Sequence, residues 1–354
     1  MTAPSDPTPS ALSAVVGPVE RRLQEILDDE RRRWSSIDAD LAEPIDVLAG
    51  FVLGGGKRLR PAFCHWAYIG AGGDPDDERI VEAGAAYELL HAFALVHDDV
   101  MDGSVTRRND RTVHVTFEQR HADSSWNGES RRFGEGIAIL VGDLAEVFAD
   151  RLMTTSPPDA FAVWNELKIE LNIGQYLDVL GAARGGVDLE TAKRIVRYKS
   201  GKYTIERPLH LGAALAGRLD EFAGLFTAFG APLGDAFQLR DDVLGTFGER
   251  DRIGKPVGDD LREGKPTALL AVALDRCDSA QRAVLGRVGS IDLDDDDIEA
   301  IRRVFLDTGA LAEVERMIDE LVEGSLRVLD GVDLDNGADG ALRELAVYVG
   351  DRRR

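Results

Sequence analysis

The chain has 354 residues and a formal net charge of −22 at pH 7, with 64 acidic and 42 basic residues. This acidity repels polyphosphate polymers, so nucleic acid is not an expected partner. Two cysteines, Cys64 and Cys277, are too few for a disulfide framework or a thiolate metal site, and each is expected to pack as a small hydrophobe.

The N-terminal residues 1–18 are rich in Pro, Ser, Thr and Ala and lack helical periodicity, which predicts a mobile tail. They contain no basic segment followed by an apolar stretch, and no run of ~18 apolar residues occurs elsewhere, so neither a secretory signal nor a membrane span is predicted. A cytoplasmic protein is therefore expected. No Pro/Gly/Ser-rich linker follows, and residues 19–354 are predicted to form one domain.

Beyond the tail, apolar residues recur at three- and four-residue spacing, and period-two alternation is scarce. This pattern predicts an all-α fold, a large helical bundle whose many Ala and Gly residues let the helices approach closely around a deep central cavity. The acidic run at 294–297 is expected to begin a helix, where negative charge suits the helix dipole. The clearest predicted helices cover residues 20–34, 77–101, 136–154, 159–183, 189–216 and 219–244.

The first candidate site residues are aspartates that follow the nearly apolar run LHAFALVH at 90–97. Asp98 and Asp102 lie one turn apart on the same helix face, with Asp99 beside them. Carboxylates at a buried helix end repel one another unless a cation compensates them, and ligation by oxygen alone favours Mg²⁺. The sequence therefore predicts a magnesium site here, with an exposed acidic helix end as the alternative.

A second aspartate pair, Asp241 and Asp242, closes the helix predicted at 219–244. The two pairs could face each other across one cavity and hold a shared cluster of metal ions. Gly245 stands where a further carboxylate would lie one turn after Asp241, so a structural role is a stronger alternative for this pair.

Basic segments flank both aspartate groups. The sequence GGGKRLRP at 54–61 is a glycine loop that can approach an anion, followed by three cations and a Pro suited to the start of a helix. Arg107 and Arg108 can bind phosphate oxygens in a bidentate way. Further cations stand in KSGK at 199–202 and from Lys255 to Lys265. Each segment alone is typical of a solvated loop, and their alternation with the aspartates favours a diphosphate site.

Together these segments resemble the trans-isoprenyl diphosphate synthases, and the resemblance runs from about residue 54 to residue 267. The matching segments, in chain order, are GGGKRLRP at 54–61, ELLH at 88–91, DDVMD at 98–102 with RR at 107–108, GQYLD at 174–178, YKSGKYT at 198–204, and FQLRDD at 237–242 followed by GKPVGDDLREGK at 254–265. Gly245 departs from the family, which often has a third aspartate there, and this puts in doubt the full strength of the second metal cluster.

The resemblance implies a prenyltransferase that joins isopentenyl diphosphate to allylic diphosphates, with about three Mg²⁺ per active site. Residues implied to hold the isopentenyl diphosphate are Lys57, Arg60, His91 and Arg108. Residues implied to bind Mg²⁺ are Asp98, Asp102 and Asp241, with Asp99 and Asp242 beside them. Residues implied to hold the allylic leaving group are Arg107, Lys199 and Lys255. Residues that match lining positions with less defined roles are Gln175, Asp178, Ser200, Gln238 and Lys265.

The expected mechanism needs no protein nucleophile. Metal ions and cations stabilise the departing diphosphate, the allylic C–O bond ionises in a dry cavity, and the isopentenyl double bond attacks the carbocation. Loss of a proton to the released diphosphate restores an alkene. His97 is accordingly expected to have a core or supporting role.

Product length is expected to depend on the side chains before the first aspartate. Phe93 and Ala94 lie five and four residues before Asp98, so one bulky and one small side chain project below the metal site. In the family, this combination resembles geranylgeranyl diphosphate synthases, so a twenty-carbon product is favoured. Farnesyl diphosphate and a mixture of the two products are the alternatives.

Condensation has rival interpretations, of which a lipid- or nucleotide-binding module fits least well because two metal clusters around one cavity exceed what binding requires. A terpene cyclase would share the fold and the aspartates, but it needs no second diphosphate pocket of the kind formed by Lys57, Arg60 and His91. A non-catalytic partner subunit would be expected to lack the aspartates or the Arg107–Arg108 pair. The family usually forms homodimers, so the resemblance implies a homodimer.

Overall fold

The computed structural model describes residues 9–108, 110–184, 197–248, 258–290 and 292–351, together with residues 190, 192 and 194. These residues form the predicted all-α fold. The strands found among them, β1 (Thr106–Arg107) and β2 (Asp110–Arg111), make one short antiparallel hairpin.

The six segments predicted as helices correspond to α1, α4, α6, α7, η2 with α9, and α10. The helices of the first half are α1 (Ser10–Ser35), η1 (Ala39–Ala42), α2 (Glu43–Leu53), α3 (Leu59–Gly70), α4 (Glu78–Asp102), α5 (Val113–Asp123), α6 (Ser130–Met153) and α7 (Pro158–Arg184). Those of the second half are η2 (Arg197–Glu206), α9 (Arg207–Leu215), α10 (Leu219–Phe247), α12 (Asp259–Arg262), α13 (Ala268–Arg276), α14 (Ser279–Leu285), α15 (Asp295–Asp307), α16 (Ala310–Val328), η3 (Asp335–Gly337) and α17 (Ala338–Asp351).

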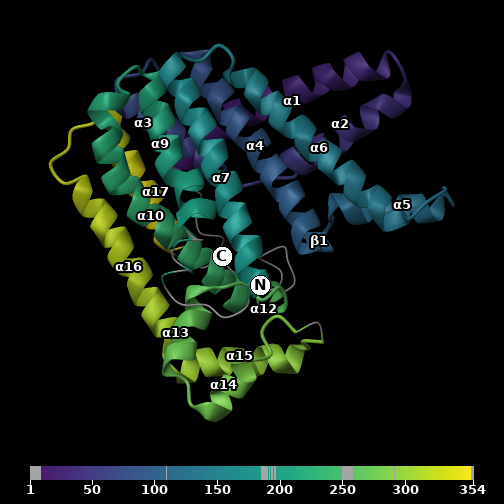
Figure 1. Ribbon diagram of the computed structural model, residues 1–354. Helices are drawn as coiled ribbons and strands as arrows, with labels where there is room; N and C mark the ends of the chain where they lie inside the picture. The colour runs from purple at the N-terminus through teal and green to yellow at the C-terminus, as the bar shows by residue number, and fades with distance from the viewer. Residues whose placement is uncertain are drawn as a thin grey trace, which may run out of the picture.

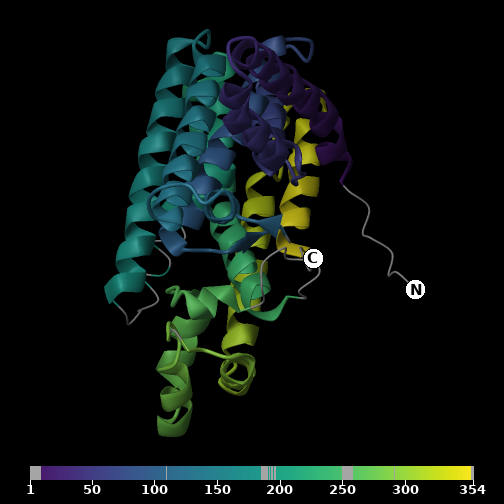
Figure 2. The same ribbon diagram turned by 90° about the vertical axis from the view of Figure 1, so that its right-hand side faces the viewer.

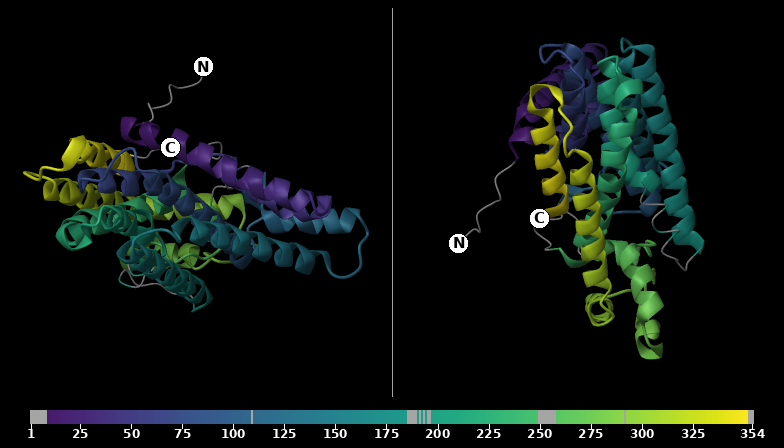
Figure 3. Two further views of the ribbon diagram at one scale, coloured as in Figure 1. Left: turned by 90° about the horizontal axis from the view of Figure 1, so that it is seen from above. Right: turned by 90° about the vertical axis from the view of Figure 1, so that its left-hand side faces the viewer.

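The long helices lie side by side and contribute to one large hydrophobic core (Figure 1). Figure 2 shows α13, α14 and α15 projecting beyond one end of the bundle, where a second apolar cluster joins them to α10 and α16. Helices α16 and α17 pack against α10 on the outside of the bundle (Figure 3). None of the described helices is both long enough and apolar enough to cross a membrane.

Residues 10–18, predicted as part of a mobile tail, belong to helix α1. Helix α1 begins at Ser10, and Ala11 and Leu12 are buried in the core. The carboxylate of Glu344 accepts hydrogen bonds from the Ser10 backbone and hydroxyl and from the Ala11 backbone, so it caps the helix. Local sequence could not reveal this cap because its donors and acceptor are far apart along the chain. Residues 1–8 lie outside the described part.

Local signals set several helix ends. Helix α4 begins after Asp77, whose side chain accepts a backbone hydrogen bond of the first turn. It ends after Asp102 because Gly103 adopts the left-handed conformation, with φ of 67°, that favours glycine. The acidic run expected to begin a helix does so, since Asp294 and Asp297 form a capping box at the start of α15.

The segment η2 is a π-helix, whereas the sequence predicted an ordinary helix over residues 189–216. It packs between α7 and α10, and glycines allow the close approach. A Cβ added to Gly174 would overlap the Lys199 backbone, and one added to Gly234 would overlap the Gly201 backbone. The wide turn of the π-helix depends on these contacts between helices, and apolar periodicity along the sequence does not indicate them.

His210 on α9 is a buried imidazole next to this region. Its Nε2 lies 2.9 Å from the Thr227 Oγ1, and its Nδ1 lies 3.4 Å from an Arg207 nitrogen. Burial, with a further contribution from the positive charge of Arg207, lowers the pKa of His210 from an ordinary value of 6.5 to about 4. Between these two values the unfolded chain binds more protons at this residue than the folded chain does.

We therefore expect the contribution of His210 to stability to be present above pH 6.5 and to be lost progressively as the pH falls towards about 4. The free energy of unfolding of the His210→Gln variant should fall less over this window than that of the wild type. Urea unfolding at about pH 4.5 and about pH 7 measures the difference. An equal fall in the two proteins would contradict the assignment.

Candidate active site

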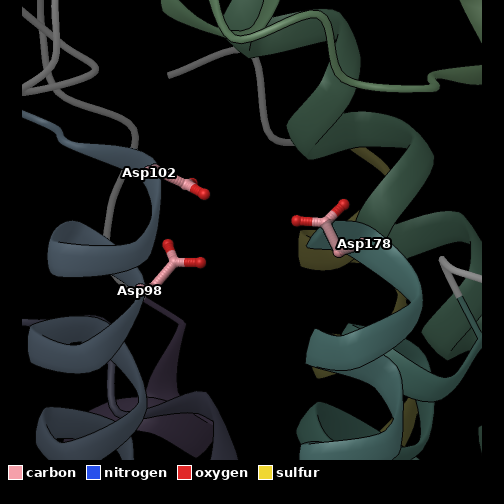
Figure 4. A group of neighbouring side chains, drawn as sticks. All are labelled: Asp98, Asp102 and Asp178. Carbon is pink, nitrogen blue, oxygen red and sulfur yellow. The ribbon is translucent and has the colours of Figure 1, made fainter. Parts of the chain in front are cut away.

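Three carboxylates from two helices face one another across a short gap (Figure 4). Asp98 and Asp102 lie one turn apart at the end of α4, and Asp178 faces them from α7. One carboxylate oxygen from each residue lies within 4.8 Å of the others. All three side chains are largely buried. Negative charges this close repel one another unless cations balance them.

Lys199 of η2 balances part of this charge. Its ammonium group pairs with Asp178 and lies 3.1 Å from Asp98 Oδ1. Gln175, on α7, donates a 2.9 Å hydrogen bond to the same Asp98 oxygen. Burial lowers the pKa of Lys199, but the carboxylates of Asp98 and Asp178 outweigh burial and raise it above its ordinary value. Lys199 is therefore charged at neutral pH.

Asp99 turns to Arg107 and is not part of the group of three carboxylates. Its side chain is 1% exposed, and both of its oxygens lie 2.8 Å from Arg107 Nε. The Arg107 Nη2 also lies 3.4 Å from Asp98. Asp99, predicted from the sequence as a site residue beside Asp98, thus positions a guanidinium group at the edge of the carboxylates.

Lys265 makes a similar contact on Asp102. Its ammonium group lies 3.1 Å from Asp102 Oδ2, 2.6 Å from Glu263 and 3.5 Å from Asp260. Burial lowers the pKa of Lys265, but these three carboxylates outweigh burial and keep it well above its ordinary value. The segment that follows α10 is therefore tied electrostatically to the end of α4.

The second aspartate pair lies near the end of α10. Asp242 is buried and accepts a 2.8 Å hydrogen bond from Gln238. Burial raises the pKa of Asp242 well above its ordinary value, and the charges of Asp260 and Asp241 add to this effect. A Cβ added to Gly245 would overlap the Asp260 carboxylate. The carboxylate of Asp260, from the segment that follows α10, thus lies beside Gly245, the position where the sequence lacks an aspartate.

A cavity of about 380 Å³ lies between the glycine loop before α3, α4, η2 and α10. The loop, the helices and the β-hairpin bring several of the predicted binding residues to its wall. These are Lys57, Arg60, His91, Arg107, Arg108, Ser200 and Asp241. The cavity is therefore predominantly cationic, with Asp241 at its wall as a link to the second aspartate pair.

Arg60 and Arg108 have no described carboxylate within ion-pair distance. Arg60 donates to the Thr204 hydroxyl at 3.0 Å and lies 4.2 Å from the centre of the Tyr203 ring. Arg108 donates to the Phe51 carbonyl at 3.3 Å. An anion in the cavity would balance charges that the described part of the protein leaves uncompensated.

His91 is neutral in this environment. Its Nδ1 is buried and finds no hydrogen-bond partner among the described residues. Burial lowers the pKa of His91 well below its ordinary value, and the positive charges of Arg60 and Arg108 lower it further. A neutral imidazole can donate one hydrogen bond to a phosphate oxygen without adding charge.

Phe93 and Ala94, the residues predicted to limit product length, lie on α4 before the aspartates. Phe93 is buried, and its ring packs edge to face with His97 at a centroid distance of 4.7 Å. The His97 Nε2 lies 3.0 Å from the Ile139 carbonyl oxygen. His97 thus contacts Phe93 and the backbone of α6, and its supporting role stays a prediction. Lys255, the remaining predicted leaving-group residue, lies outside the described residues.

The group of three carboxylates suits a hard divalent cation. Its ligand atoms are all oxygens, and they are close enough to share one ion. Asp102 Oδ2 is buried, and its contact among the described residues is the ion pair with Lys265 at 3.1 Å, which lacks hydrogen-bond geometry. Because Mg²⁺ typically combines one or two carboxylates with water and phosphate oxygens, these residues fit magnesium together with a phosphate ligand.

Sequence reasoning assigned incomplete roles at this site. It named Asp178 as a lining residue but did not place it with Asp98 and Asp102. It did not single out Asp260 and Glu263, the partners of Lys265. The available signal was their position five and two residues before Lys265 in the segment GDDLREGK, where opposite charges stand close together along the chain.

The comparisons with known proteins identify the family and the fold. The family model for polyprenyl synthetase matches residues 42–305. The chain is 31% identical to the geranylfarnesyl diphosphate synthase of Aeropyrum pernix over 321 residues, which cover 87% of this chain and 95% of the relative. It is 33% identical to the geranylgeranyl diphosphate synthase of Sulfolobus acidocaldarius over 260 residues, which cover 71% and 73%. The fold is similar to the crystal structure of the Corynebacterium glutamicum geranylgeranyl pyrophosphate synthase complexed with isoprenyl diphosphate and magnesium, with a TM-score of 0.90, 35% identity, and coverage of 98% of this chain and 100% of that chain.

We expect Asp178→Asn to weaken Mg²⁺ binding roughly tenfold, because the amide keeps the shape of the side chain but removes one ligand charge. Calorimetric titration with MgCl₂ in the presence of inorganic pyrophosphate measures this affinity. Asp123→Asn, an exposed position on α5, is the matched control and should bind as the wild type does. Unchanged affinity in Asp178→Asn would remove Asp178 from the ligand set.

Proposed function

This chain belongs to the polyprenyl synthetase family, and we propose that it condenses isopentenyl diphosphate with an allylic diphosphate to make geranylgeranyl diphosphate. Its relatives and structural neighbours are trans-isoprenyl diphosphate synthases, which are prenyltransferases. The observation that carries the proposal is a pair of adjoining sites of opposite charge. One is the group of three carboxylates that fits Mg²⁺, and the other is the cationic cavity beside it.

The two sites suit two diphosphates that must be treated differently. An allylic diphosphate would bind through Mg²⁺ at Asp98, Asp102 and Asp178, because its diphosphate has to leave. Isopentenyl diphosphate would bind directly to Arg60 and Arg108, with Lys57 and His91, because it keeps its diphosphate. A terpene cyclase has no use for this second pocket.

The protein residues hold the leaving group and keep water from the cation. Arg107 and Lys199 lie at the carboxylates, where they can donate to the departing diphosphate. When bound, Mg²⁺ neutralises the charge that develops on that group. Leu95 and Phe237 line the adjoining cavity and offer the allylic cation an apolar surface. The isopentenyl double bond forms the new C–C bond, and the released diphosphate accepts the proton that is lost.

A further Mg²⁺ is assigned to Asp241, which would bring the number to about three per active site. Its neighbour Asp242 is buried, and Asp260 adds a carboxylate beside Gly245. Metal binding near these residues would lower the pKa of Asp242, which burial otherwise keeps high. Ser200, Gln238 and Lys265 are assigned to the lining of the same site, and Lys255 to the allylic leaving group.

The proposed twenty-carbon product rests on Phe93 and Ala94. A buried aromatic ring on α4 would stop the growing chain, while the small neighbour leaves room beside it. The relatives named above make products of different length by their names, so family membership alone does not determine the product. Farnesyl diphosphate or a mixture is the alternative outcome.

The experiment is incubation of the purified protein with Mg²⁺, labelled isopentenyl diphosphate and each allylic starter, followed by chromatography of the dephosphorylated products. A twenty-carbon alcohol would support the whole proposal. A shorter or longer alcohol would support condensation and contradict the assigned length. Absence of elongation with every starter would contradict condensation and favour a non-catalytic partner subunit.

Phe93→Ala should shift the product towards longer chains, because it removes the ring that blocks the tail. Product chromatography with farnesyl diphosphate as the starter measures the shift. Phe161→Ala, a partly exposed aromatic on α7, is a control that should leave the product length unchanged. The same length from Phe93→Ala and the wild type would show that another residue limits the chain.

A homodimer is also proposed. Helix α6 exposes Ile139, Leu140 and Val147, and helix α7 exposes Ile169 and Ile173. Rows of exposed apolar side chains on adjoining helices favour an interaction surface. Light scattering after size-exclusion chromatography tests this state, and a monomer at micromolar concentration would contradict it.

A further inference from the structure

Arg58 lines the cationic cavity, yet its side chain is only 1% exposed. Its guanidinium group pairs through Nη1 with Glu88 of α4. The Nη2 donates a 2.9 Å hydrogen bond to the Val52 carbonyl of α2 and lies 3.4 Å from Glu20 of α1. The buried guanidinium group of Arg58 therefore links α1, α2 and α4 to the residue that precedes α3.

The backbone of Arg58 is also unusual. Its φ is 52°, in the left-handed region that few residues other than glycine adopt. Arg58 is the last residue before α3 and closes the glycine loop that begins at Gly54. A strained conformation of this kind persists where surrounding contacts determine it, and here the contacts are those of the guanidinium group. The side chain of Arg58 and the shape of the loop are therefore coupled.

Two arginines donate hydrogen bonds to carbonyl groups at the C-terminal end of α2. The last carbonyl groups of a helix have no partner within the helix and carry partial negative charge. Arg58 donates to Val52, and Arg108 donates to Phe51 at 3.3 Å. A Cβ added to Gly56 would lie 3.2 Å from Arg58 Nη1 and 3.7 Å from Arg108 Nη2. The loop backbone thus lies against both guanidinium groups.

The two arginines differ in charge balance. Arg58 is paired with Glu88 and approaches Glu20, so its charge is compensated within the protein. Arg108 has no described carboxylate in ion-pair contact and remains available to an anion. Glu88 lies three residues before His91 on α4, so the buried pair fixes the loop relative to the helix that carries His91.

We propose that Arg58 is a positioning residue for the diphosphate of the homoallylic substrate, and that Glu88 is the partner through which it acts. The buried pair holds the glycine loop so that Lys57, Arg108 and His91 converge on one anion. Arg58 does not itself bind the diphosphate. The inference rests on the proposed function and adds a determinant of affinity for one of the two substrates.

Arg58→Lys is the first variant, because lysine keeps the charge but cannot donate to separate acceptors in a fixed fork. We expect the KM for isopentenyl diphosphate to rise roughly tenfold, with the KM for the allylic substrate changed less than about twofold. Arg79→Lys is the matched control, since Arg79 is exposed and pairs with Asp77 at the other end of α4. It should change neither KM.

Glu88→Gln distinguishes positioning from direct binding. If Arg58 bound the diphosphate, loss of its counter-charge would strengthen binding and lower the KM for isopentenyl diphosphate. If Arg58 positions the loop, the same substitution weakens the contact between Arg58 and Glu88, and the KM for isopentenyl diphosphate rises several-fold. A lower KM in Glu88→Gln, or equal rises of both KM values in Arg58→Lys, would overturn the inference.

Titration of the substrate-free protein with inorganic pyrophosphate, in buffer without divalent metal, needs no turnover and so separates this inference from the proposed function. Weaker binding by Arg58→Lys and Glu88→Gln than by Arg79→Lys would support the role of Arg58 even if the wild type failed to condense the substrates. Equal binding by all three variants, at unchanged thermal stability, would contradict it.

Discussion

Repulsion between buried carboxylates is the constraint on which this site depends. Helices α4 and α7 bring Asp98, Asp102 and Asp178 together, although carboxylates at this spacing are unfavourable without positive charge nearby. Lys199 and Lys265 supply that charge from two other parts of the chain, and both remain protonated because the carboxylates surround them. Under the proposed function, the same cations that compensate the carboxylates would also contact the diphosphate held there through Mg²⁺.

The π-helix η2 links this group to the cationic cavity. Lys199 contacts Asp98, while Thr204, five residues later, receives a hydrogen bond from Arg60. In an α-helix a residue five positions on lies about 140° around the axis, so the two side chains would diverge. The i→i+5 turn brings them towards the same side, and Gly174 leaves room for it. One short element can therefore set the relative position of the two proposed substrates.

The long helices and most site residues were predictable because they depend on local patterns. Apolar periodicity indicates α4 and α10, and both aspartate pairs stand at the ends of such patterns. The start of α1 was not predictable, since Glu344 caps it from the opposite end of the chain. Nor was the place of Asp178, because it depends on how α7 packs against α4. The carboxylate beside Gly245 comes from Asp260, which follows α10 and reaches that position only in the folded chain.

In the cationic cavity, too, buried charges of one sign repel one another, and here the charges are positive. Burial and the charges of Arg58 and Arg107 lower the pKa of Arg108, so positive charge is disfavoured at the wall of this cavity. Arg58 and Arg108 also adopt left-handed backbone conformations, each at a cost of about 1–2 kcal/mol. The hydrophobic cores must offset these costs before any ligand binds. An anion in the cavity would relieve this repulsion, so under the proposed function the affinity for a diphosphate depends on how closely the surrounding contacts keep these cations together.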